Sequence, residues 1–180
     1  MCSKEAGFTL IEAVIAMAVV AVLFAIAVPA WTNARAAVHN AATLAALEGS
    51  LLDAVRHAGI TATEVVICPS SDAGHCSGSS DWSDGWIVFA DLDADRNRDA
   101  NETLLRRASP LEGGVRLRST EGRTRLVFQP NGGNAGSNVT FTLCDGRGPA
   151  KATTLVISNS GQMRYGVPTS AAAQSCAYGR

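Results

Sequence analysis

The fold of this chain is decided near its amino terminus, where residues 7–31 read GFTLIEAVIAMAVVAVLFAIAVPAW. From Ala13 to Trp31 there is no polar side chain. Built as a helix, the longer run from Phe8 to Trp31, which only Thr9 and Glu12 interrupt, extends roughly 36 Å, enough to cross the hydrocarbon of a bilayer. A cleaved secretory signal has a positive start and a shorter apolar core, whereas here Lys4 is balanced by Glu5. The stretch therefore predicts a membrane helix that the mature protein keeps.

Glu12 interrupts the apolar stretch with a carboxylate, which is costly in hydrocarbon and usually marks a function or a partner. The segment Gly7-Phe8-Thr9-Leu10-Ile11-Glu12 resembles the processing signal of type IV pilins and type II secretion pseudopilins. The resemblance implies that an inner-membrane prepilin peptidase cuts between Gly7 and Phe8 and that Phe8 becomes N-methylated. It also implies that Glu12 pairs with the terminal ammonium of a neighbouring subunit, an attraction that is strong in a low-dielectric helix bundle.

The residues after Trp31 take on a helical period. Apolar side chains recur at spacings of three and four, with polar residues between them, at Val38, Ala41, Ala42, Leu44, Ala45, Leu51, Leu52 and Val55. This pattern predicts an amphipathic continuation of the helix, which we expect Gly59 to stop. The chain then divides into a leader at 1–7, a membrane helix at 8–30, its amphipathic continuation at 31–59 and a globular domain at 60–180.

The globular region reads as short strands separated by turns. The candidate strands are rich in β-branched or aromatic residues and are bounded by turn residues: Glu64–Cys68, Trp86–Ala90, Thr103–Arg107, Val115–Arg118, Arg125–Phe128, Thr140–Cys144, Thr153–Ser158 and Met163–Tyr165. The connections are too short for crossover helices, so we expect antiparallel pairing. A long amino-terminal helix packed on antiparallel sheets is an α+β fold. Residues 169–175 read as a tail of small residues.

The chain has five cysteines. Removal of the leader takes Cys2 away and leaves four, an even number that favours two disulfides in an exported protein. Of the three possible pairings we favour Cys68–Cys76 with Cys144–Cys176, because each pair closes a loop rich in Gly, Ser and Ala. A zinc site of Cys68, His75 and Cys76 is the weaker alternative, since this spacing matches no familiar ligand pattern.

An acidic segment has the ligand spacing of a helix-flanked calcium loop. Positions 1, 3, 5, 7, 9 and 12 of a twelve-residue window are occupied by Asp91, Asp93, Asp95, Asn97, Asp99 and Glu102. Two features argue against calcium, because Arg96 stands where a glycine makes the sharp turn and the flanks read as strands. We therefore expect a polar hairpin turn in which Arg96 and Arg98 neutralise the carboxylates. A calcium-binding adhesion module is the alternative from a different class.

Composition and charge exclude several classes of function. A chain that is 47% hydrophobic with a formal net charge of −1 is neither disordered overall nor a generally basic nucleic-acid binder. It has no recognisable nucleophile and base pair, no phosphate-binding glycine loop and no metalloprotease motif, so we expect no enzyme and no cofactor. The charge is divided unevenly, −8 over residues 1–102 and +7 over residues 103–180. The second part is therefore the one expected to meet an anion.

Arginines of the second part come in pairs. Arg116 with Arg118, and Arg123 with Arg125, have a spacing of two, which places both members of a pair on one face of a strand. If the turn at 120–122 joins the two strands as a hairpin, all four guanidinium groups share one surface.

Several segments of the globular region resemble the FimT/GspH-type minor pilins. They are Cys68-Pro69, Trp82–Trp86, Val88-Phe89, Leu104-Leu105-Arg106, Phe128-Gln129-Pro130-Asn131-Gly132 and Cys144-Asp145-Gly146-Arg147-Gly148. The resemblance implies a pilin-like fold and a minor subunit at or near the tip of a type IV pilus, with other pilin or pseudopilin subunits as partners. It also implies a single-pass protein of the bacterial inner membrane, whose periplasmic domain later reaches the pilus at the cell surface.

Some members of that family bind DNA during natural transformation through the arginines of a Gly-Arg-x-Arg motif. The matching segment here is Gly161-Gln162-Met163-Arg164, in which Gln162 replaces the first arginine. The loss of one of a few phosphate contacts costs about tenfold in affinity. We expect weak, non-specific contact with double-stranded DNA from a basic patch of Arg147, Lys151, Arg164 and Arg180. The alternative within filament systems is a type II secretion minor pseudopilin that engages protein partners.

Overall fold

The computed structural model describes residues 7–179. Residues 1–6, which make up most of the predicted leader and include Cys2, lie outside the described residues, as does Arg180. The chain divides into two compact units at the boundary between Arg35 and Ala36. Helix α1 (Leu10–Thr61) contributes residues to both units.

In the first unit, α1 presents an apolar surface to its surroundings. Every residue from Gly7 to Arg35 is exposed, and the most apolar window of the helix has a mean hydropathy of 2.8. By length and composition, α1 is the one helix among residues 7–179 that is long and apolar enough to cross a membrane. A continuous apolar surface of this size marks contact with lipid or with another protein.

The start of α1 is stabilised by reciprocal hydrogen bonds between Thr9 and Glu12. The backbone N–H and the hydroxyl of Thr9 donate to Glu12 Oε2 at 2.8 and 2.7 Å, and the Glu12 N–H donates to Thr9 Oγ1 at 3.4 Å. This is a capping box, in which a residue before the helix and an acid three positions later satisfy each other's backbone donors. The Glu12 carboxylate therefore helps to begin the helix.

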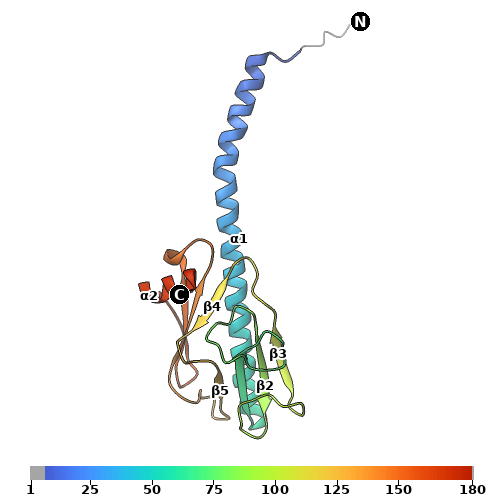
Figure 1. The fold of residues 1–180 in the computed structure, drawn as a ribbon, viewed down its shortest axis with the longest axis vertical. Helices are drawn as coiled ribbons and strands as arrows, with labels where there is room; N and C mark the ends of the chain where they lie inside the picture. Colours follow the sequence, from blue (N-terminus) through green and yellow to red (C-terminus); the bar gives the residue numbers. More distant parts are fainter. Residues whose placement is uncertain (1–6, 180) are drawn as a thin grey trace. The chain divides into compact units, whose positions relative to one another are not determined.

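In the second unit, two four-stranded sheets lie around the remaining turns of α1 (Figure 1). The first sheet has the order β3-β2-β1-β5, with β1 (Glu64–Pro69), β2 (Trp86–Asp91), β3 (Leu104–Ala108) and β5 (Leu126–Phe128). The second has the order β4-β6-β7-β8, with β4 (Arg116–Ser119), β6 (Val139–Cys144), β7 (Thr153–Ile157) and β8 (Met163–Gly166). All of these strand pairs are antiparallel, as the short connections predict.

The hydrophobic core lies between α1 and the inner faces of both sheets. The helix buries Leu47, Leu51, Ala54 and Ala58 completely. Their spacings of four, three and four place these side chains on one helical face. They pack against a cluster that draws on both sheets and includes Ile67, Val88, Leu126, Leu117, Phe141 and Leu155.

Two buried tryptophans connect the layers. Trp86 lies on β2, and its Nε1 donates to Ser50 Oγ of α1 at 2.9 Å. Trp82 lies before β2, and its Nε1 donates to Ser119 Oγ of β4 at 3.1 Å. The Trp82 ring also meets Phe141 of β6 edge-on, with ring centroids 4.9 Å apart. A buried indole N–H without an acceptor is costly, so the two serines are polar residues that the core requires.

Each sheet has an outer layer that a disulfide fastens to it. On the first sheet, Val66 and Phe89 belong to a buried cluster against which the loop closed by Cys68–Cys76 packs. On the second sheet, helix α2 (Ser170–Tyr178) is attached through Cys144–Cys176. Because both faces of β1 and β2 are buried, their sequences are continuous apolar runs and do not alternate.

Each predicted strand is present, with bounds that differ by one residue at one or both ends. The helix passes Gly59 and ends at Thr61, where Ala62 adopts the left-handed conformation that ends a helix, with φ 55°. Most of the tail of small residues belongs to α2, a helix that the sequence pattern does not predict. The Thr169 hydroxyl caps that helix by accepting the Ala172 N–H at 3.2 Å.

Candidate functional site

Both predicted disulfides, Cys68–Cys76 and Cys144–Cys176, are present. The zinc alternative is wrong, because its two thiols are bonded to each other and zinc requires thiolates. The second bond joins β6 to α2 across a sequence separation of 32, compared with 8 for the first. It is therefore the bond that holds the tail of the chain on the second sheet.

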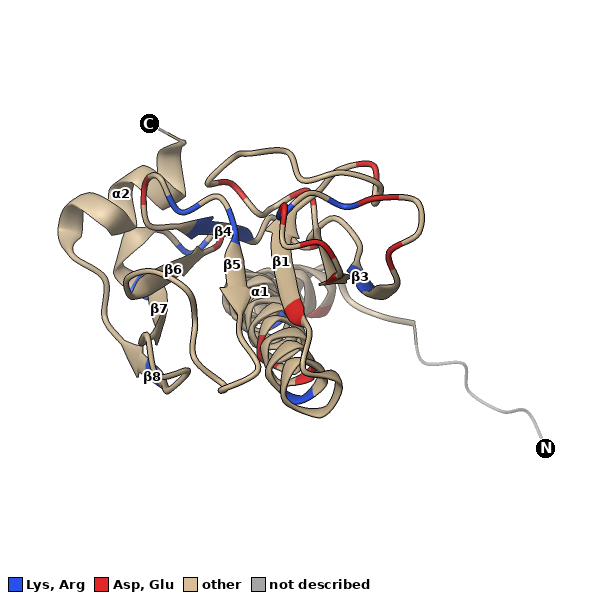
Figure 2. Ribbon diagram, turned by 90° about the horizontal axis from the view of Figure 1, so that it is seen from below, with Lys and Arg blue, Asp and Glu red and all other residues tan. Residues whose placement is uncertain are grey.

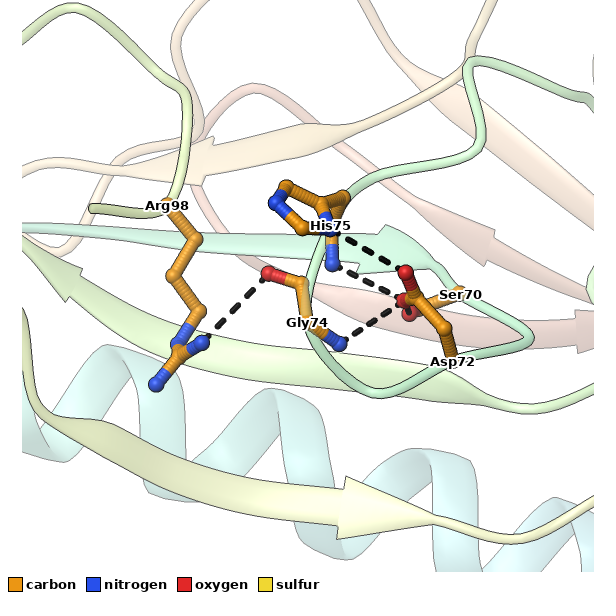
Figure 3. Close-up of polar contacts among 5 residues, drawn as sticks. All are labelled: Ser70, Asp72, Gly74, His75 and Arg98. Carbon is orange, nitrogen blue, oxygen red and sulfur yellow. Dashed lines mark hydrogen bonds and ion pairs between the residues drawn. The ribbon is translucent and has the colours of Figure 1, made fainter. Parts of the chain in front are cut away.

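The loop closed by the first disulfide is organised by Asp72 (Figure 3). Its Oδ1 accepts the backbone N–H groups of Gly74 and His75 at 2.8 and 3.0 Å and the Ser70 hydroxyl at 3.0 Å. Its Oδ2 lies 3.1 Å from His75 Nδ1. These bonds, with the His75 backbone N–H first, hold the pKa of Asp72 well below its usual range. The Asp72 and His75 side chains are 58% and 81% exposed, so the arrangement is a surface turn.

The acidic segment is the hairpin connection between β2 and β3, as the strand-like flanks predict. Asp91 and Glu102 are buried, whereas Asp93, Asp95 and Asn97 are exposed. Figure 2 shows several acidic residues in the loops near β1 and β3. Oxygen atoms of the three aspartates at 91, 93 and 95 lie within 4.8 Å of one another.

The predicted internal neutralisation of this loop by its arginines is wrong. Arg98 Nη1 donates instead to the carbonyl of Gly74 in the disulfide loop at 3.4 Å (Figure 3). Among residues 7–179, neither Arg96 nor Arg98 forms an ion pair with a carboxylate. The carboxylates of Asp91, Asp93 and Asp95 lie close to one another, whereas the Arg98 side chain contacts the neighbouring disulfide loop.

Arg164 lies on β8, an edge strand of the second sheet, and is exposed. Its neighbour Met163 packs against the core, so the alternation along a strand directs Arg164 to the outer face. Lys151 ends the short helix η1 (Pro149–Lys151) and is exposed as well. Arg164 of β8 lies opposite Val156 of β7. Along the chain, Lys151 and Val156 are separated by no more than about 17 Å, at about 3.4 Å per residue. Arg164 therefore lies on the second sheet itself, whereas Lys151 lies on η1, the segment that precedes β7.

Arg147 is held by a buried carboxylate. Its Nε and Nη2 donate to Asp145 Oδ1 and Oδ2 at 2.9 and 2.6 Å, and Asn40 Nδ2 of α1 donates to Asp145 Oδ2 at 3.0 Å. Of the two side chains, Asp145 has no exposed surface and Arg147 is 20% exposed. The Arg147 side chain, more than any other group, holds the pKa of Asp145 below its usual range despite burial. Sequence reasoning missed this pair, whose signal is the spacing of two in Asp145-Gly146-Arg147.

The hairpin that would place the four arginines of residues 116–125 on one surface does not form. Strand β4 pairs with β6 in the second sheet, whereas β5 pairs with β1 in the first. The turn between β4 and β5 therefore crosses from one sheet to the other and forms no hairpin. Accordingly, Arg123 bonds to Ser137 and Arg125 Nη1 donates to the carbonyl of Arg96 at 2.5 Å. Figure 2 shows basic residues spread over separate elements, among them β4 and β8.

The two arginines of β4 hold the carboxyl end of α2. Arg116 Nη1 donates to the carbonyl of Ala177 at 3.4 Å, and Arg118 Nη1 donates to the carbonyl of Ser175 at 3.2 Å. Cations suit this end of a helix, where carbonyl groups lack intrahelical partners and the dipole is negative.

A cleft of about 560 Å³ opens beside Arg118, lined by residues of the second sheet and α2 that include Arg118, Glu121, Thr140, Thr142 and Ser175. Its described lining contains no histidine or free thiol, the groups that most often act as general base or nucleophile.

Comparisons with known proteins place this structure in a family. Residues 45–161 match the family model described as type II transport protein GspH. The chain belongs to the GspH family. Residues 2–28 of this GspH-family protein also match the prokaryotic N-terminal methylation motif. These matches confirm the resemblance to minor pilins and pseudopilins.

One solved protein, in two crystal forms, shows a similar fold. The type IV minor pilin FimU of Pseudomonas aeruginosa is 19% identical, with a TM-score of 0.50 over 77% of this chain and 94% of that chain. A second crystal form of FimU has a TM-score of 0.51 over 79% of this chain and 92% of that chain, also at 19% identity. The minor pseudopilin EpsH of the Vibrio cholerae type 2 secretion system is 13% identical, with a TM-score of 0.48 over 70% of this chain and 96% of that chain. A search of curated proteins gave no significant match.

Proposed function

We propose that this GspH-family protein is a minor filament subunit. In this proposal it is cut between Gly7 and Phe8 and methylated on Phe8. The part of α1 that belongs to the first unit holds it in the inner membrane. Its second unit faces the periplasm and, after assembly, the cell surface. The observation that carries the proposal is the exposed apolar surface of α1, on which Glu12 is the one acid in the first turn. The methylation motif over residues 2–28 supports the processing step.

Glu12 has the capacity for a second partner in this proposal. Its Oε2 accepts both donors of Thr9, whereas Oε1 accepts no hydrogen bond from the described residues. The free oxygen suits the terminal ammonium of a neighbouring subunit, since a lone carboxylate among packed apolar helices is costly without an opposite charge. Capping of α1 and pairing between subunits therefore use different oxygens of one carboxylate.

The test is a comparison of processing with assembly. In cells, we expect mass spectrometry to find mature protein that begins at methylated Phe8. Glu12→Gln should be processed normally yet enter filaments at least about tenfold less, because the charge is lost while an acceptor oxygen is kept. Thr9→Val is the control that removes the capping hydroxyl and leaves the charge, and it should still assemble. An intact Met1 on mature protein, or normal filament content of Glu12→Gln, would refute the proposal.

We also propose that the outer face of the second sheet contacts double-stranded DNA without sequence preference. Arg164 and Lys151 supply the cations, and both are exposed. Arg147 is left out of these contacts because Asp145 already neutralises it. With so few phosphate contacts, binding should be weak and should fall steeply with salt.

The DNA proposal is tested by fluorescence anisotropy on the full chain in detergent at low salt. Arg164→Ala should weaken binding about threefold to tenfold, and Gln162→Arg should tighten it by about the same factor. Arg56→Ala is the matched control, because Arg56 is also exposed but lies on α1. Equal losses in both alanine variants, or no binding at low salt, would remove the DNA role. The type II secretion alternative would then be favoured, with other pseudopilins as partners.

A further inference from the structure

We propose that the loop joining β2 and β3 binds one calcium ion through the carboxylates of Asp91, Asp93 and Asp95. Oxygen atoms of these three residues lie within 4.8 Å of one another. Opposite ligands of a calcium ion lie about 5 Å apart, because each Ca–O distance is about 2.3–2.6 Å. All three oxygens can therefore contact one ion without a large rearrangement of the loop.

The buried carboxylate oxygen of Asp91 gives separate support for a cation site in this loop. Asp91 is only 2% exposed. Its Oδ2 accepts the Arg96 N–H at 3.1 Å, but its Oδ1 is buried and accepts no hydrogen bond from residues 7–179. A buried polar atom is nearly always satisfied in a folded protein. Because Asp91 belongs to the carboxylate cluster, a cation bound there supplies the partner that Oδ1 lacks.

The local charge favours a cation as this partner. The carboxylates of Glu102 and Asp93 place further negative charge beside the Asp91 carboxylate. Both oxygens of Glu102 accept backbone N–H groups, from Leu92 at 2.8 Å and from Asp99 at 3.0 Å, so this carboxylate is fixed close to the site. Among residues 7–179, no basic side chain forms an ion pair with the cluster.

The backbone conformation of the loop removes the objection that Arg96 occupies the glycine position of a calcium loop. Arg96 stands where a calcium loop usually has glycine, yet it adopts the left-handed conformation with φ 64°. Its N–H reaches back to Asp91, while Asp95 N–H donates to Asp93 Oδ1 at 3.2 Å and Asn97 N–H donates to Asp95 Oδ1 at 2.6 Å. The strand flanks are no obstacle, because the ligands come from the loop itself.

Calcium is favoured over magnesium by the type and number of ligands. Calcium accepts six to eight oxygens in a flexible geometry, whereas magnesium requires a near-ideal octahedron with shorter bonds. The loop offers three clustered carboxylates, and Asn97 and Asp99 follow at the spacing of further oxygen ligands. Exposed Asp93 and Asp95 leave room for water to complete the coordination.

The test is calorimetric titration of calcium into chelator-treated full chain in detergent. We expect one ion per chain with a dissociation constant between about 10⁻⁵ and 10⁻³ M, and a higher melting temperature in calcium. Asp93→Asn and Asp95→Asn should each weaken binding at least about tenfold. Both residues are exposed, so these variants should fold even if Asp91→Asn does not.

Asp84→Asn is the matched control, because Asp84 is an exposed aspartate outside the loop. It should bind calcium as the unchanged chain does. Three results would overturn the proposal: no heat and no thermal stabilisation at 10 mM calcium (about ten times the weakest expected dissociation constant), equal affinity in Asp93→Asn and in Asp84→Asn, or equal affinity for magnesium and calcium.

Discussion

At the scale of single residues, the buried pair of Asp145 and Arg147 decides how β6 and its following turn meet α1. The carboxylate has no exposed surface, and three donors surround it: the Arg147 guanidinium, the Arg147 backbone N–H at 3.0 Å and Asn40 Nδ2. A buried charge is tolerated only when it is paired and hydrogen-bonded. The pair is therefore structural, which explains why Arg147 is not a free cation.

Replacing Asp145 by Asn should destabilise the protein strongly. The variant leaves the largely buried Arg147 without its counter-charge, and the expected loss is about 3 kcal/mol in the free energy of unfolding. Asp53→Asn is the control, because it breaks an exposed ion pair with Arg106 whose side chains are 54% and 42% exposed. That loss should stay below about 1 kcal/mol. Similar losses in the two variants, measured by chemical denaturation in detergent, would contradict the structural role of Asp145.

The pair of Asp145 and Arg147 also predicts that the free energy of unfolding depends on pH. The folded pKa of Asp145 lies below its ordinary value, so the unfolded chain takes up a proton first as the pH falls. The contribution is complete above an unfolded pKa of about 3.9 and is lost as the pH falls through the lower folded pKa. Between pH 5 and pH 2, unfolding free energy should therefore fall more steeply in the unchanged protein than in Asp145→Asn. Parallel curves would show that Asp145 does not titrate in this way.

At the scale of elements, α2 depends on the second sheet. Nine residues are too few to form a stable helix alone in water. It is held by the Cys144–Cys176 bond, by the arginines of β4 at its carboxyl end and by the burial of Ala173. The first disulfide has the corresponding role for the loop on the outer face of the first sheet.

Removing one disulfide should loosen one outer layer and leave the other in place. Replacing Cys144 and Cys176 by Ser should cost about 2–4 kcal/mol and raise hydrogen exchange in α2. The matched change of Cys68 and Cys76 should instead raise exchange in residues 69–75. Hydrogen-exchange mass spectrometry distinguishes the two, and uniform loosening after either change would contradict separate attachment.

At the scale of the whole molecule, the two units have different requirements. All buried residues of α1 lie from Asn40 onward, so residues 7–35 contribute none of the core. Its apolar side chains are suited to lipid or to packed helices of other subunits. The second unit has its own core and both disulfides.

A chain that begins at Ala36 should therefore fold and stay in solution without detergent. Its thermal midpoint, measured by circular dichroism, should lie within a few degrees of that of the full chain in detergent, because no core contact is lost. The full chain without detergent should aggregate through its exposed apolar helix. Unfolding of the shortened chain at room temperature would contradict the independence of the second unit.

Properties that depend on neighbouring residues were readable from the sequence by itself. The apolar run to Trp31, the helical period after it and the strand segments are local patterns, and each agrees with the structure to within one or two residues. The two disulfides could also be proposed, because small residues mark the loops that they close. The processing signal and the calcium spacing are local patterns as well.

Only the tertiary structure decided the properties that depend on distant contacts. It separated β4 from β5 into different sheets, because each strand completes a different part of the core. It stabilised α2, whose small residues have too little apolar periodicity to predict a helix. It also determined which charged side chains have partners, because burial and contacts depend on segments far apart in the chain. Arg147 is paired with Asp145, and Arg98 donates a hydrogen bond to the disulfide loop. Asp91 has a buried oxygen that accepts no hydrogen bond from the described residues.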